Sequence, residues 1–238
     1  MAMTQLCNLY KSGTYRKGDE RLYIASCDKN YEYINKNAYQ AILTAFDGYT
    51  QEAYEDSVGA IVQTNRNEKL DLTLDKMYYA PMLQLLDFLK ANGFDIYIVS
   101  GSELGFLRRY GGTYLRIPER NMIGSAIELT YGNDPLTNTA SFIRDSAYMS
   151  PMASGPGKAE LIENHIGVQP ILAFGNTMGD FEMLQYTGAN EYENLSLILV
   201  HNDSSEYVYY DPLLDSAARV NNWVSVKMQE DFNVIFPD

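Results

Sequence analysis

The chain has 238 residues, of which 46% are apolar and 21% charged. This composition is typical of a globular protein with one domain and a subdomain, or with two small domains. The 31 acidic and 18 basic residues give a net charge of -13, so the average surface field repels phosphate backbones and anionic lipid. We therefore expect neither nucleic acid nor a membrane as a partner. An anionic substrate would need a local cation or a helix N-terminus.

Two cysteines occur, Cys7 and Cys27, without metal-ligand spacing. This argues against a disulfide framework and against a zinc site. No apolar run approaches the length of a membrane-spanning helix, and the first residues, MAMTQLCNLYKSG, lack the features of a secretory signal. The sequence as written predicts a cytoplasmic protein, and a signal peptide ahead of it would instead make the protein extracytoplasmic.

The first 75 residues are polar and rich in tyrosine. Between residues 37 and 63, apolar residues recur at helical spacing on both sides of Gly48, which predicts two amphipathic helices with a break there. We therefore expect this part of the chain to be mostly helical.

From residue 76 onward, predicted helices alternate with short apolar strands. A helix that stops at Asn92-Gly93 precedes the strand DIYIVSG, and the later strands are PILAFGN and LSLILVHND. The helices between and after them are KAELIENHIG and MGDFEMLQYTG, while residues 122–149 predict strands around an Asn133-Asp134-Pro135 turn. Alternation of this kind indicates an α/β fold with a parallel sheet covered by helices on both faces.

Ligands of such sheets bind at the carboxyl ends of the strands, and polar residues stand at three of these ends. Ser100 and Gly101 follow the first strand, where a hydroxyl and a glycine amide at a helix N-terminus can bind a tetrahedral anion. In isolation such residues more often form an ordinary turn.

Lys158 follows a loop rich in glycine and proline, at the start of a predicted helix. Its ammonium group could neutralise a phosphoryl oxygen, although a single lysine is more often solvated than functional. The GPGK string differs from a P-loop in its glycine spacing, and Ala159 stands where Ser or Thr would bind magnesium.

Asn176 and Asp180 follow the strand PILAF, and their oxygen atoms suit Mg²⁺. An Asp near a helix start is also an ordinary cap.

Together these segments resemble the haloacid dehalogenase (HAD) superfamily, from about Met77 to the C-terminus. IYIVSGSE resembles motif II with Ser100, Lys158 matches motif III, and GNTMGD resembles motif IV. Further strings are similar to a phosphoserine-phosphatase-like bacterial branch: YAPMLQLLDFLKANGF, NMIGS, NHIG, PILAFGNTMGDFEML and the tail FNVIFPD.

The resemblance implies a Rossmann-like α/β core over residues 76–238 and a helical cap subdomain over residues 1–75. It also implies a magnesium-dependent phosphatase acting on a small phosphorylated metabolite. An aspartate of a DxD motif would attack the phosphoryl group, and the resulting aspartyl phosphate would be hydrolysed. Phosphoserine and phosphocholine are both admissible substrates, and the sequence leaves the oligomeric state open.

The same resemblance assigns the site residues. Ser100 and the Gly101 amide would bind the phosphate, Lys158 would stabilise the transferring phosphoryl group, and Asn176 and Asp180 would serve Mg²⁺. Asn176 stands where many relatives have Asp, so weaker metal binding is expected.

The DxD motif and its strand, which is the central one of the family's sheet, are missing from the sequence. The best substitute is Asp28 in LYIASCDKN, but the second acid there is an Asn and no small-residue turn follows. The expected nucleophile therefore lies upstream, and the chain as written is expected to be inactive. The alternatives are a wrongly assigned start, a fragment, or a degenerate pseudoenzyme that binds phosphate and metal.

The two histidines, His165 and His201, are expected to be structural or exposed. The tyrosine-rich first third leaves a partner-binding module as a further alternative function.

Overall fold

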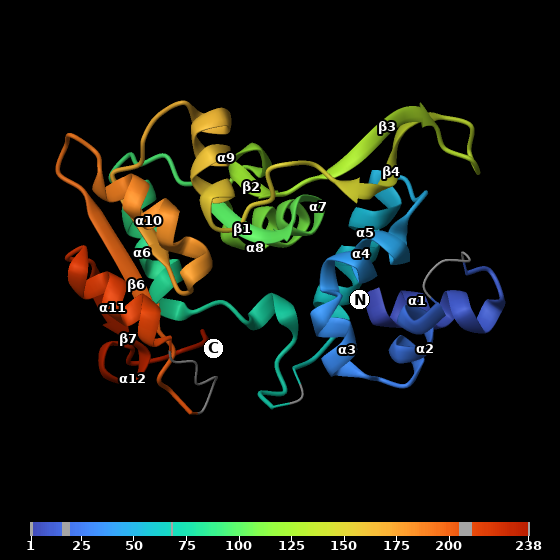
Figure 1. Ribbon diagram of the computed structural model, residues 1–238, viewed down its shortest axis with the longest axis horizontal. Helices are drawn as coiled ribbons and strands as arrows, with labels where there is room; N and C mark the ends of the chain where they lie inside the picture. The colour runs from blue at the N-terminus through green and yellow to red at the C-terminus, as the bar shows by residue number, and fades with distance from the viewer. Residues whose placement is uncertain (1, 16–19, 68, 205–210, 238) are drawn as a thin grey trace. The chain divides into compact units, whose positions relative to one another are not determined.

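The computed structural model describes residues 2–15, 20–67, 69–204 and 211–237 (Figure 1). By its internal contacts the chain divides into unit 1, residues 1–61 and 126–149, and unit 2, residues 62–125 and 150–238. This division does not follow the single boundary expected at residue 75. The reason is that residues 126–149 return to the first helices: the Arg144 amide donates to the Tyr49 carbonyl, and the Gly48 amide donates to the Arg144 carbonyl.

Unit 1 combines the expected helices with a hairpin that the sequence analysis had placed in the α/β core. Its helices are α1 Ala2–Ser12, α2 Glu20–Cys27, α3 Tyr31–Lys36, α4 Ala38–Phe46 and α5 Gln51–Thr64, the last of which runs past the unit boundary. The break between α4 and α5 falls at Gly48, where φ is 76°. The antiparallel strands are β3 Ile127–Asn133 and β4 Ala140–Tyr148, and the Asp134 carboxylate accepts the Leu136 and Thr137 amides in the turn between them.

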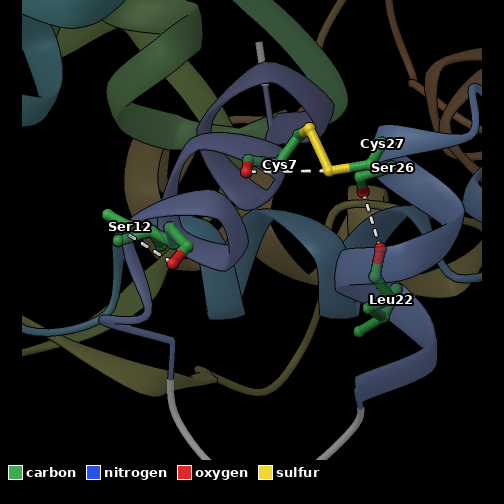
Figure 2. The surroundings of a disulfide bond; sticks show 6 residues. Cys7, Ser12, Leu22, Ser26 and Cys27 are labelled. Carbon is green, nitrogen blue, oxygen red and sulfur yellow. Dashed lines mark hydrogen bonds between the residues drawn. A yellow bond between two sulfur atoms is a disulfide. The ribbon is translucent and has the colours of Figure 1, made fainter.

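A disulfide joins α1 to α2, which corrects the expectation drawn from the cysteine count. Figure 2 shows Cys7 bonded to Cys27, 20 residues later, with the Cα atoms 4.8 Å apart. In the same helix α2, the Ser26 hydroxyl donates to the Leu22 carbonyl. The helical hairpin brings together two cysteines whose spacing carries no signature of pairing.

The alternative nucleophile Asp28 does not follow a strand. The segment that would form this strand is helix α2, and its last residue is Cys27. Asp28 and Lys29 form the turn after it, with Lys29 at a φ of 54°. This part of the chain therefore lacks the strand-to-loop context that the alternative requires.

Unit 2 alternates helices and strands. Its strands are β1 Ile98–Glu103, β2 Met122–Ser125, β5 Leu172–Gly175, β6 Leu195–Val200 and β7 Val224–Lys227. Its helices are α6 Ala80–Ala91, α7 Leu104–Leu107, α8 Thr113–Leu115, α9 Pro156–Ile166, α10 Phe181–Gly188, α11 Pro212–Val220 and α12 Met228–Asp231. Short 3₁₀ turns lie at Leu74–Lys76, Glu119–Asn121 and Met178–Asp180, and a π-helical turn lies at Arg108–Gly112.

Two small parallel sheets form the centre of unit 2. Strand β1 pairs with β2, and β5, β6 and β7 pair in that order, with Leu172 opposite Leu195 and Leu197 opposite Val224. In the part of the chain that the structure describes, no ladder joins β1 to β5. A common apolar core ties both sheets to their helices, and its buried members are Ile123, Ile162, Ala173, Met183, Leu184, Ile198, Leu214, Ala218 and Trp223.

Candidate functional site

The loop ahead of α9 places Lys158 in the first turn of that helix. Gly155 takes a φ of 55°, which favours glycine. A Cβ on Gly157 would lie 2.0 Å from the Met152 carbonyl oxygen, so no other residue fits there without moving the backbone. The loop therefore directs Lys158 inward, and the residue is only 8% exposed.

Lys158 forms a buried ion pair with Asp180. The Nζ atom lies 2.5 Å from Asp180 Oδ1 and donates a second hydrogen bond, of 3.1 Å, to the Val99 carbonyl of β1. Both side chains are almost fully removed from water, with 10% and 6% of their surface exposed. An ammonium group has three N–H donors, and the third has no partner among the described residues.

The Asp180 carboxylate is held by the loop between β5 and α10. Its Oδ2 atom accepts the amides of Asn176 at 2.8 Å and Thr177 at 3.0 Å, while the Thr177 hydroxyl accepts the Gly179 amide. This reciprocal arrangement is a capping box. A Cβ on Gly175 would lie 2.5 Å from Asp180 Cβ, so the glycine lets the aspartate pack against the end of the strand.

The Asn176 side chain contacts a histidine that the sequence interpretation left out of the site. Asn176 Nδ2 lies 3.0 Å from His201 Nε2, and His201 is 5% exposed. The histidine follows β6, the neighbour of β5. The rule that residues after adjacent parallel strands lie together could have found it.

Ser100 and Gly101 lie within β1 rather than at a helix N-terminus. The pairing of β1 with β2 becomes irregular between Val99 and Glu103. There the Ser100 hydroxyl donates to the Ser102 hydroxyl at 3.2 Å and accepts the Ser102 amide. Helix α7 begins after these residues, and the Glu103 carboxylate caps it by accepting the Phe106 amide. Ser100 and Gly101 therefore do not occupy the helix N-terminus at which the sequence analysis expected them, and Ser100 is adjacent to Val99, whose carbonyl binds Lys158.

The structure thus brings together most of the predicted site residues. Lys158 contacts both β1 and Asp180, and the backbone amide of Asn176 donates to the same carboxylate. In this arrangement the positive charge of Lys158 is neutralised by Asp180. A phosphoryl group would meet the remaining ammonium N–H and would compete with Asp180 for the others.

The residues present do not form a magnesium site by themselves. Mg²⁺ requires near-octahedral coordination by oxygen, whereas both carboxylate oxygens of Asp180 already accept hydrogen bonds. No group of three or more His, Cys, Asp or Glu residues that could hold a metal occurs within the described ranges. A metal here would need further oxygen ligands from outside these residues.

Comparisons with known proteins assign no family to the chain. No protein-family model and no curated protein matches the chain. Among solved structures, it is similar to a phosphoserine phosphohydrolase-like protein from Francisella tularensis subsp. tularensis SCHU S4, with 15% identity and a TM-score of 0.43. The match covers 92% of this chain and 91% of that one. Within the described residues, no helix has the length and apolar character needed to span a membrane.

Proposed function

We propose that a polypeptide containing this chain hydrolyses a small phosphomonoester such as phosphoserine. The observation that carries the proposal is the buried pair of Lys158 and Asp180, which contacts Val99 in β1 and packs against Gly175 at the carboxyl end of β5. A lysine in a site removed from water can stabilise the charge of a transferring phosphoryl group.

In this proposal the nucleophile is an aspartate supplied from ahead of Met1. One of its carboxylate oxygens attacks phosphorus, and the bond from phosphorus to the alcohol oxygen breaks. A second acidic residue protonates the leaving alcohol. Water then attacks the acyl phosphate, gives its proton to that second residue, and releases inorganic phosphate with the carboxylate restored.

The residues of this chain bind and orient the group that is transferred. Lys158 donates to the phosphoryl oxygens as its contact with Asp180 loosens, and Ser100 and the Gly101 amide bind the remaining oxygens. The residues of this chain do not form a magnesium site by themselves. A Mg²⁺ ion held by Asn176, Asp180 and further oxygen ligands from outside these residues would supply charge neutralisation.

The alternative function is a protein that binds phosphate without turnover. The observation in its favour is that both oxygens of Asp180 are satisfied within the chain, by Lys158 and by two loop amides. Such a protein would keep an ordered site and lack the covalent step.

Hydrolysis of p-nitrophenyl phosphate in the presence of Mg²⁺ separates the two functions. The assay compares residues 1–238 with a chain extended upstream by the residues that its gene encodes. We expect activity in the extended chain alone, a loss of at least about 100-fold in Lys158→Met, and none in Lys227→Met, which removes an exposed charge from the same unit. Inactivity of the extended chain, or equal activity of Lys158→Met, would reject the proposal.

A further inference from the structure

A cavity of about 830 Å³ lies between the two small sheets of unit 2. Ile98 and Val99 of β1 line it, as do residues 172–174 of β5. Helices α6 and α9 contribute Leu86 and Ile162, and most of the lining side chains are aliphatic or aromatic. The cavity is therefore an apolar space between strands β1 and β5.

Both strands present an unpaired edge to this cavity. Strand β1 has β2 as its ladder partner and β5 has β6, and no other ladder involves either strand in the described part of the chain. An unpaired edge exposes a row of backbone N–H and C=O groups that another strand can bind. Two such edges across one apolar cavity form a slot for a strand.

The two edges run in the same direction. Lys158 contacts the Val99 carbonyl in β1 and also Asp180, which packs against Gly175 at the end of β5. Val99 is the last residue of β1 before its ladder with β2 becomes irregular, so the ends of the regular part of β1 and of β5 both approach this side chain. Residues just ahead of each strand, Tyr97 and Ile171, line the same cavity. A strand between them can pair in parallel with both.

The volume of the cavity matches a short strand. A strand rises about 3.3 Å per residue, lies about 4.8 Å from each neighbour and belongs to a layer about 10 Å thick, so each residue takes on the order of 160 Å³. The cavity of about 830 Å³ therefore holds about five residues. Strands β5 and β1 have 4 and 6 residues, respectively.

Strand order indicates where the missing strand stands in the sequence. With the slot filled, the sheet reads β2, β1, new strand, β5, β6, β7. If the new strand comes first in the chain, this is the order 3-2-1-4-5-6 of the doubly wound fold. A strand from beyond the C-terminus would give a different order, and the tail is already engaged, since the Ile235 carbonyl accepts the Ala80 amide at the start of α6.

We infer that this slot binds an apolar strand of about five residues, encoded ahead of Met1 and parallel to β1 and β5. The strand completes one continuous sheet and covers the apolar side chains of α6 and α9. Its carboxyl end lies between Val99 and Gly175, beside Lys158. That an acidic residue follows this strand rests on the proposed function, whereas the strand itself does not.

The test compares hydrogen exchange in residues 1–238 with exchange in the chain extended by its gene-encoded upstream residues. We expect the amides of residues 98–101 and 172–175 to exchange at least about 100-fold more slowly in the extended chain. The control is the same extension with two alternate residues of its apolar run changed to proline, which removes ladder donors. This control should restore fast exchange while β6 and β7 keep their rates.

Three results would overturn the inference. They are a reading frame ahead of Met1 that encodes no apolar run, equal protection by the proline variant, or protection of residues 1–238 that rises with protein concentration, which would make a second copy the occupant. Exchange is independent of catalysis. An extended chain that protects both edges but hydrolyses no phosphomonoester would reject the proposed function and leave the slot in place.

Discussion

At the scale of single residues, the Lys158–Asp180 pair is the most consequential contact of unit 2. Its side chains are 10% and 6% exposed. Removal of one partner from such a pair leaves a buried charge without compensation. Lys158→Met should therefore lower the free energy of unfolding by on the order of 3 kcal/mol. Urea unfolding followed by fluorescence of Trp223 reports on this unit, because the chain has one tryptophan and it lies there.

The matched control for this variant is Arg219→Met. Arg219 pairs with Asp215 one helical turn away, but 78% of its side chain is exposed. An exposed pair of this kind contributes about 0.5 kcal/mol or less. Asp180→Asn in the Lys158→Met background should recover part of the lost stability. An equal loss in the buried and exposed variants would contradict the burial argument.

Gly175 is the second residue on which the site geometry depends. In Gly175→Ala, the new Cβ would lie 2.5 Å from Asp180 Cβ. The loop must then shift, and we expect a loss of about 1–3 kcal/mol in the same urea experiment. Gly188→Ala is the comparison, because its nearest neighbour would be Trp223 Nε1 at 3.9 Å. Its unfolding midpoint should change little, and a matching loss there would argue against the steric explanation.

At the scale of elements, the disulfide links α1 to α2. Its bridge closes a loop of about 20 residues, which predicts about 3 kcal/mol of stabilisation from the entropy of the unfolded chain. Treatment with a thiol reductant should speed hydrogen exchange in both helices and leave the Trp223 transition unchanged. The Cys7→Ser, Cys27→Ser variant should exchange fast with or without reductant. A reductant effect that persists in this variant would contradict the assignment.

The hairpin of unit 1 is held to the helices by Arg144. This side chain is 1% exposed, lies 3.6 Å from the Tyr54 ring centroid and donates to Gln51 Oε1 at 2.7 Å. Arg144→Met should destabilise β4 by roughly 2–3 kcal/mol, measured as faster exchange of residues 140–148. Arg21→Met removes a similar but exposed contact, over Tyr33, and should change exchange little. A comparable effect of both variants would show that burial does not set the strength of the contact.

At the scale of the whole molecule, local patterns in the sequence predicted most elements. Glycine and asparagine stops predicted the ends of α6 and α9 because these positions take left-handed or capping conformations. The sequence also predicted that Lys158, Asp180 and Asn176 lie close together, because parallel strands align their carboxyl ends at one edge of the sheet.

Features that depend on distant contacts were not predicted. The return of residues 126–149 to the first helices depends on pairing of Arg144 with the segment at Gly48 and Tyr49. The disulfide depends on the packing of α1 against α2. The position of Ser100 inside β1 depends on an irregular ladder with β2, which strand propensity does not encode.

The central claim is that Lys158 and Asp180 serve an aspartate that is supplied from ahead of Met1. Its most direct test is to mix the gene-extended chain with radiolabelled p-nitrophenyl phosphate, quench in acid and map the labelled peptide. We predict a label that hydroxylamine removes, located ahead of Met1 and absent from residues 1–238 alone. A label within residues 1–238, at Asp28 or elsewhere, or no covalent label during turnover, would contradict the account.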